Sequence, residues 1–212
     1  MRHIFFTLMT LALFFGMVSC CDAKKGEVSD NETTTETTMN TTMQDLMTRR
    51  SIRSYTDEIP SDEVIAEICE AGTYAPTGMN RQSPIIIAVT NREMRDKLSQ
   101  MNAAVMNSEG DPFYGAPVVL VVLANREAAM TWKEDGSLVM GNLMNAAHAK
   151  GLGSCWIHRA REVFETPEGK AILADLGIEG DYVGIGNCIL GYVNGDYPEA
   201  RPRKDNYVYW IK

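Results

Sequence analysis

Two short basic stretches, far apart in the chain, offer the residue types of an anion site. The first, RRSIRSY, spans residues 49–55, and the second, ARPRK, spans residues 200–204. Arginine carries a planar guanidinium that stays charged and can donate two parallel hydrogen bonds to a phosphate or carboxylate. In an extended segment alternate side chains point the same way, so Arg49, Ser51 and Arg53 would share one side. The first stretch is therefore half of an anion site or, alternatively, a solvated helix end whose cations favour the helix dipole.

A third polar stretch, APTGMNRQSP, spans residues 75–84. Two prolines and a glycine interrupt regular structure there, so the stretch predicts a loop. Its short side chains that can donate and accept hydrogen bonds are Thr77, Asn80 and Gln82. Such a loop can present amides to a ligand that carries a row of donors and acceptors. The alternative is a surface turn whose polar side chains satisfy only their own backbone.

Hydrophobic periodicity predicts the elements that position these stretches. Helices are expected at 43–50, 60–75, 92–107 and 137–153, with a broken helical stretch at 162–177. Thr42 is the expected N-cap of the first helix, and the fourth helix is apolar on nearly every side, as in a buried central helix. Continuous β-branched runs at 84–90 and 117–124 predict strands covered on both faces, and 182–193 predicts a last central strand. The fold class is α+β, with a small sheet wrapped by helices.

The composition is that of an ordinary globular protein. Of 212 residues, 45% are hydrophobic and 23% are charged, and the formal net charge is −8. Such an acidic chain lacks the broad basic face that nucleic-acid binding requires, which argues against nucleic acid as a partner. Cys69, Cys155 and Cys188 stand in apolar settings and are expected to be buried, with no spacing that favours a disulfide. His148 and His158 have no partners at metal-ligand spacing, so no metal site is predicted.

The first 42 residues precede the predicted fold. Residues 1–21 combine a basic start, an apolar run at 4–18 and a serine directly before Cys20. The run is short for a membrane span and typical of a signal peptide, and the serine-cysteine step resembles the box of bacterial lipoproteins. Lipid on Cys20 would hold an exported protein on a membrane without spanning it. Cys21 competes as the lipidated residue, and an ordinary cleaved signal or an uncleaved anchor is the alternative. Residues 22–42, rich in Thr and Glu, predict a flexible tether.

Five stretches together relate residues 43–212 to a known family. They are RRSIRSY (49–55), APTGMNRQSP (75–84), GLGSCWI (151–157), ILGY (189–192) and ARPRK (200–204). Their order and spacing resemble those of the nitroreductase family of FMN-dependent oxidoreductases, over essentially the whole region. The resemblance implies a nitroreductase-like α+β fold with a small mixed sheet wrapped by helices, in an interlocked homodimer.

The resemblance also implies where FMN binds. The expected phosphate and ribityl contacts are Arg49, Arg50 (often through its backbone), Ser51, Arg53, Arg201 and Arg203. The expected contacts of the flavin ring from the partner subunit are Pro76, Thr77, Asn80 and Gln82. A backbone N–H of Trp156, Ile157 or His158 would point toward flavin N5, and Arg53 is the expected cation near N1 and O2.

Two departures from the family pattern bear on substrate preference. Many relatives carry Glu-Gly or Gly-Gly where this chain has His158-Arg159. The stretch NSEGDPFYG (107–115) offers no base at the place where some relatives carry an Asn and a Lys near the flavin.

The implied reaction is a ping-pong transfer of hydride from NAD(P)H through flavin N5 to an electron-poor small molecule, such as a nitroaromatic or a quinone. The protein binds and orients, so no catalytic side chain is predicted. Sibling activities (reductive dehalogenation, flavin breakdown, oxidation of azoline rings) stay open, as does an exported lipoprotein with a vestigial flavin site. NAD(P)H is cytoplasmic, whereas the predicted signal peptide would export the protein. Either a different reductant serves outside the cytoplasm, or the N-terminus is not processed as a signal peptide.

Overall fold

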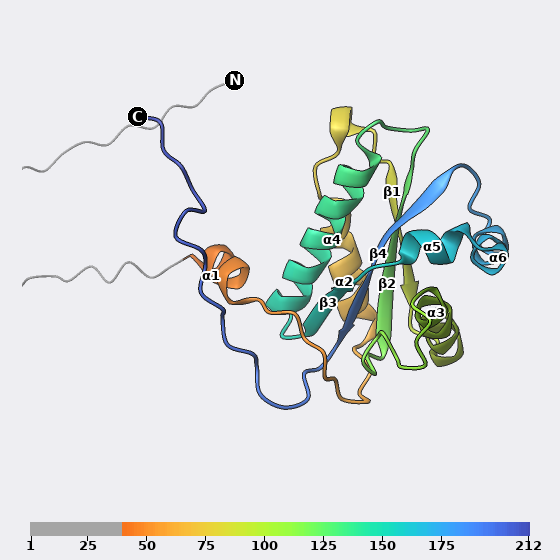
Figure 1. The fold of residues 1–212 in the computed structure, drawn as a ribbon, viewed down its shortest axis with the longest axis horizontal. Helices are drawn as coiled ribbons and strands as arrows, with labels where there is room; N and C mark the ends of the chain where they lie inside the picture. The colour runs from red at the N-terminus through yellow and green to blue at the C-terminus, as the bar shows by residue number, and fades with distance from the viewer. Residues whose placement is uncertain (1–39) are drawn as a thin grey trace, which may run out of the picture. The chain divides into compact units, whose positions relative to one another are not determined.

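The computed structural model describes residues 40–212, and Figure 1 shows how their helices and strands are arranged. The predicted signal segment with Cys20 and Cys21, and the predicted tether up to residue 39, lie outside the described residues. Within residues 40–212, no helix combines the length and the apolar character that a membrane span requires. Helix α1 (Thr41–Thr48) begins two residues earlier than expected, inside the predicted tether.

Four strands form one sheet at the centre of the fold. They are β1 (Pro84–Val89), β2 (Val118–Asn125), β3 (Gly153–Ile157) and β4 (Tyr182–Gly191), in the order β1-β2-β4-β3. Every neighbouring pair is antiparallel, and within residues 40–212 a parallel pairing occurs only at an isolated bridge between Ser51 and Ser154. The expected mixed sheet is thus antiparallel in its four strands. The predicted central strand is confirmed, because β4 lies inside the sheet.

Helices cover both faces of this sheet (Figure 1). One face carries α2 (Asp62–Thr73) and α4 (Trp132–Ala149), and the other α3 (Arg92–Val105), α5 (Ala160–Glu165) and α6 (Pro167–Asp175). In β2, Val119 and Val121 join the core under α3, α5 and α6, whereas Leu120 and Val122 join the core under α2 and α4. Burial on both sides explains the continuous apolar run, each such side chain contributing about 1.5–3 kcal/mol. Strand β1 is an edge strand and only half-buried, so the prediction that it is covered on both faces is wrong.

Short polar side chains set the helix ends. Ser61 caps α2 by accepting the N–H of Val64 at 3.4 Å. The expected cap of α1 at Thr42 is wrong, because Asn40 holds that place and its Oδ1 accepts the Thr42 N–H at 2.9 Å. Thr166 separates α5 from α6 and caps α6 by accepting the N–H of Gly169 at 3.0 Å, which confirms the predicted break.

Helix α4 begins at Trp132, five residues before the predicted start, and its polar first turn contains one buried carboxylate. Asp135 in that turn is only 2% exposed. Gly136 packs against a β4 side chain that leaves no room for a Cβ. Further along, Leu138 is 47% exposed, so α4 buries only one face. The prediction that this helix is buried on nearly every side is therefore wrong.

The cysteines behave mainly as small apolar side chains. Cys155 and Cys188 are buried and Cys69 is half-buried, and all three are free thiols. Burial raises the pKa of the Cys188 thiol to about 12, so it stays protonated and unreactive at neutral pH.

Candidate functional site

The two arginine stretches meet in one cavity of about 610 Å³. It lies at the end of α1, where the C-terminal chain runs past that helix (Figure 1). The lining residues are Leu46, Met47, Arg49, Arg50, Ser51, Ala200, Arg201 and Arg203. The structure therefore brings the predicted phosphate-site residues together, with the exception of Arg53.

The guanidinium groups in this cavity retain unused hydrogen-bond donors. Nη1 of Arg50 donates to the carbonyls of Met47 and Arg49, at 2.9 and 2.8 Å. Nη2 of Arg203 donates to the carbonyl of Arg201 at 2.9 Å. Nη1 of Arg49 and Nε of Arg50 are buried without any partner. Among the described residues, no carboxylate pairs with these four arginines. Because a buried donor without a partner is costly, the cavity fits an anion with several acceptor oxygens.

The chain leaves this cavity along the edge of β3. Ser51 forms a bridge with Ser154, and the N–H of Ile52 donates to the Ser154 carbonyl at 3.0 Å. Arg53 is exposed and lies outside the cavity, with its guanidinium 5.9 Å from the centre of the Tyr114 ring. That distance allows a cation–π contact. The alternation predicted for the three side chains therefore does not extend to Arg53.

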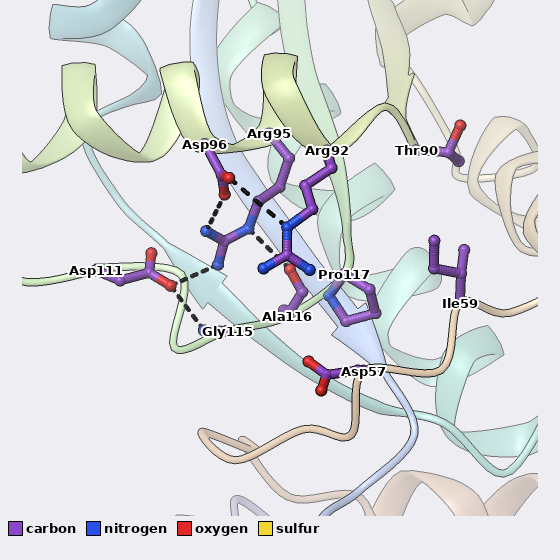
Figure 2. A pocket seen from close by; sticks show the side chains of 10 residues that line it. All are labelled: Asp57, Ile59, Thr90, Arg92, Arg95, Asp96, Asp111, Gly115, Ala116 and Pro117. Carbon is purple, nitrogen blue, oxygen red and sulfur yellow. Dashed lines mark hydrogen bonds and ion pairs between the residues drawn. The ribbon is translucent and has the colours of Figure 1, made fainter.

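The loop that carries this tyrosine is held by the carboxylate of Asp111 (Figure 2). Asp111 accepts a hydrogen bond from Arg95 Nη2 at 2.5 Å, and another from Ser99 Oγ at 2.5 Å. It also accepts the backbone N–H groups of Phe113 and Gly115, at 2.8 and 2.7 Å. Partial burial alone would raise the pKa of Asp111, but these hydrogen bonds outweigh it and hold the pKa below its ordinary value.

The charges around this loop neutralise one another. Figure 2 shows the Arg95 guanidinium between Asp96 and Asp111, and its Nε donates to the carbonyl of Ala116 at 2.9 Å. These residues line a cavity of only about 160 Å³. Since the buried arginine already has partners on all three nitrogens, we interpret the cluster as the scaffold of the Tyr114 loop.

The predicted loop between α2 and β1 is anchored to α4. It contains one short 3₁₀ turn, η1 (Gly78–Asn80). The N–H of Gly78 donates to Oδ1 of Asp135, and Ser83 Oγ donates to Oδ2 of the same carboxylate, both at 2.9 Å. This carboxylate therefore holds the loop at its middle and at its end before β1.

The predicted ligand residues of that loop do not line the arginine cavity within one chain. Pro76 is exposed. Thr77 Oγ1 accepts the N–H of Gln82 at 3.1 Å, and Gln82 Nε2 donates to Asn80 Oδ1 at 3.2 Å. Thr77 and Gln82 also line a separate cavity of about 450 Å³ between α2 and β1. The side chains thus bond within the loop and contribute nothing to the arginine cavity of their own chain.

The end of β3 forms the wall of another cavity, of about 400 Å³. Trp156 and His158 line it, with ring centres 5.8 Å apart, and Nε1 of Trp156 is buried without a partner. Ile157 between them packs into the core. Arg159 adopts a φ of 74°, in the left-handed region that favours glycine. Its side chain donates from Nε to Asn102 Oδ1 at 3.0 Å.

Sequence reasoning missed residues that support the site without lining it. Asp135 and Asp111 are carboxylates that hold loops, and their only signal is an acidic residue next to a buried apolar run. Tyr197 accepts the backbone N–H of Arg50 at 3.0 Å, and no pattern in the sequence points to it. For His148 the sequence raises only the question of metal binding, and it gives no sign of a contact to Tyr197. Within residues 40–212 no cluster of three potential metal ligands occurs.

Comparison with known proteins gives a consistent picture. Residues 46–192 match the nitroreductase family. A protein of Archaeoglobus fulgidus, provisionally named NADH dehydrogenase/NAD(P)H nitroreductase, is 33% identical over 172 residues, which are 78% of this chain and 94% of that protein. An NAD(P)H FMN reductase of Bacillus subtilis is 30% identical over 145 residues, 58% of this chain and 56% of that protein.

The solved structures agree with the fold. The structure of a nitroreductase with bound FMN from Desulfitobacterium hafniense has a TM-score of 0.73 and 27% identity, and the likeness covers 82% of this chain and 100% of that one. Since the family match spans more than half of the chain, and the archaeal protein is matched along nearly its whole length, this chain belongs to the nitroreductase family.

Proposed function

We propose that the protein is an FMN-dependent NAD(P)H oxidoreductase, and the arginine cavity is the observation that carries the proposal. The terminal phosphate of FMN is a dianion that needs several charged donors at once. The cavity offers guanidinium groups from both ends of the domain, with buried donors on Arg49 and Arg50 that lack a partner. The relatives support the same cofactor and donor, since the Desulfitobacterium structure contains FMN and the Bacillus enzyme is an NAD(P)H FMN reductase.

The residues of this chain bind and orient the cofactor. Arg49, Ser51, Arg201 and Arg203 hold the phosphate, and the backbone around Arg50 closes the cavity beside them. A bound FMN would supply hydride transfer from a reduced nicotinamide to an electron-poor acceptor. Arg53, outside the phosphate cavity, supplies a cation for the flavin ring. No side chain of the protein acts as a nucleophile.

The active form is a homodimer with shared flavin sites. Within one chain the loop at 75–84 lines no part of the arginine cavity, which supports an arrangement in which the two predicted halves of a flavin site meet between subunits. Apolar side chains also stay exposed along α1 and near the C-terminus, as expected of a surface that a partner covers. They are Met43, Leu46, Met47, Tyr207, Val208, Tyr209, Trp210 and Ile211.

The acceptor is a small electron-poor molecule such as a nitroaromatic or a quinone, reduced in a ping-pong cycle. The cavity lined by Trp156 and His158 suits a planar molecule, because aromatic rings stack on such ligands. The purified protein should show the yellow flavin absorption once loaded with FMN, NADH or NADPH should bleach it, and the acceptor should restore it. A protein that cannot be loaded with FMN would favour the alternative, an exported binding protein with a vestigial site.

We also propose that the chain is exported and anchored to a bacterial membrane through lipid on Cys20. Cys20→Ala should then release the protein into the soluble fraction with its flavin site intact. Cys21→Ala is the matched control and should remain with the membrane. Retention of the Cys20→Ala protein and release of the Cys21→Ala protein would move the anchor to Cys21.

A further inference from the structure

The C-terminal segment that supplies Arg201 and Arg203 is held in place by very few polar contacts. Between residues 195 and 212, Tyr197 is the one residue whose hydrogen bonds reach other parts of the described chain. Arg201 and Arg203 are themselves exposed, and the one hydrogen bond of the Arg203 side chain goes to the Arg201 carbonyl. The position of both arginines over the cavity therefore depends on Tyr197, a few residues before them.

The hydroxyl of Tyr197 connects three parts of the fold. It accepts the backbone N–H of Arg50 at 3.0 Å, at the point where the chain leaves α1 and lines the cavity. It also lies 3.0 Å from Nδ1 of His148, near the end of α4. On the other side of the ring, Nε2 of His148 lies 2.8 Å from Oγ1 of Thr48. Figure 1 shows the same meeting point, where the C-terminal chain passes α1 near the end of α4.

One proton arrangement satisfies every group in this chain of contacts. The N–H of Arg50 donates to the Tyr197 oxygen, which leaves the tyrosine hydrogen free for Nδ1 of His148. A neutral ring then carries its hydrogen on Nε2 and donates to Thr48, whose hydroxyl donates to the Gln44 carbonyl at 2.8 Å. His148 is thus a fixed point between α1, α4 and the C-terminal segment.

We propose that the Tyr197–His148 pair is the positioning element that assembles the anion site from its two halves. The pair holds the backbone of Arg50 on one side and the segment that bears Arg201 and Arg203 on the other. Neither residue lines the cavity, so both act through the arginines and not on the ligand. The inference rests on the proposed function, because the assembled site is detected by its binding of the FMN phosphate.

The two amide substitutions of His148 separate its two contacts. Asparagine places a polar atom near the position of Nδ1 and keeps the contact to Tyr197, whereas glutamine reaches the position of Nε2 and keeps only the contact to Thr48. Dissociation constants for FMN and for riboflavin, which lacks the phosphate, should be measured with the full-length protein. The proteins compared are the wild type, Tyr197→Phe, His148→Gln and His148→Asn. His148→Gln should weaken FMN binding by about three- to tenfold, the effect of one hydrogen bond, and Tyr197→Phe, which loses the contacts to both Arg50 and His148, should weaken it at least as much. Riboflavin binding should change by less than about twofold in every variant, because it does not depend on the phosphate site.

The outcomes distinguish this inference from the proposed function. His148→Asn should bind FMN nearly as well as the wild type, and Tyr197→Phe combined with His148→Gln should bind it no more weakly than Tyr197→Phe alone. Equal losses in His148→Asn and His148→Gln, or FMN affinity unchanged by Tyr197→Phe, would overturn the positioning role. A wild-type protein that binds FMN no better than riboflavin would instead overturn the phosphate site and the proposed function with it. Melting temperatures of the variants show whether each remains folded.

Discussion

The backbone N–H of Gly78 donates a hydrogen bond to Oδ1 of the buried Asp135, 2.9 Å away, and so joins the loop before β1 to the first turn of α4. The second oxygen of the same carboxylate accepts from Ser83. A loop of polar side chains on the surface is ordinarily mobile, but this one is fixed at two points by one charge. If the loop reaches the flavin of the partner subunit, its shape is set before the subunits meet.

Loss of this carboxylate should cost stability. Asp135→Ala leaves two donors without their acceptor in a buried place, and we expect the free energy of unfolding to fall by about 2–4 kcal/mol. Asp135→Asn keeps one acceptor oxygen and should lose about half as much. Glu134→Ala, an exposed neighbour in the same turn, is the control and should cost less than about 1 kcal/mol. Urea unfolding measures all three, and equal losses at 134 and 135 would mean that the loop contacts contribute nothing.

The carboxylate of Asp111 should make stability depend on acid pH. Its pKa lies below the ordinary value in the folded protein, because Ser99, Arg95 and two backbone N–H groups favour the charged form against the opposing effect of burial. The stabilisation is therefore complete above the unfolded pKa of about 4 and is lost as the pH falls through the lower folded value. Melting temperatures between neutral pH and about pH 2.5 should show the difference between wild type and Asp111→Asn shrinking below about pH 4.

An exposed carboxylate on the rim of the same cavity serves as the control. Asp57 lines that cavity, and the structure gives it no ion pair among the described residues. Asp57→Asn should follow the wild-type pH profile. A difference between wild type and Asp111→Asn that stays constant down to the lowest pH would contradict the role of the Asp111 charge.

The sequence was sufficient to predict the core elements and the meeting of the arginine stretches. The β2 run is buried on both faces because its alternate residues enter two cores, and the pattern of β-branched residues reports that directly. Arg49 and Ser51 line one cavity with Arg201 and Arg203, as their residue types suggest. Whether these side chains bind FMN remains a prediction.

Other features could not be read from the sequence because they depend on contacts between distant segments. The start of α4 is polar, and the loop that Asp135 holds explains why this carboxylate is buried. Arg53 follows the same alternation as its neighbours, yet it lies over Tyr114 outside the cavity. Tyr197 and His148 are 49 residues apart in the chain, and no spacing rule relates them.

The proposed homodimer should resist dilution. An interlocked pair with shared flavin sites buries on the order of 2,000 Å² or more, and such obligate interfaces do not separate at low micromolar concentration. Sedimentation equilibrium over a dilution series should therefore give a single species of twice the chain mass. A monomer that still binds FMN tightly would refute the shared-site arrangement, because the loop at 75–84 could then contribute nothing to the site.

The arginines of the cavity should contribute to FMN binding through one shared anion. Arg49→Ala and Arg203→Ala should each weaken FMN binding by about 1.5–3 kcal/mol, the usual contribution of a hydrogen bond to a charged group. Their combined effect should differ from the sum, because both side chains would bind the same phosphate. Arg92→Ala is the control, since that side chain is 82% exposed and lies outside the arginine cavity.

Riboflavin, which has the flavin ring but lacks the phosphate, tests whether the arginines bind the phosphate group. It should bind the wild type weakly and should be nearly indifferent to Arg49→Ala and Arg203→Ala, because the group that these arginines hold is missing. Inorganic phosphate should compete with FMN for the wild type and lose that ability in the double variant. If both single variants keep wild-type FMN affinity, the first arginine stretch is a solvated helix end, and the cofactor site must lie elsewhere on the domain.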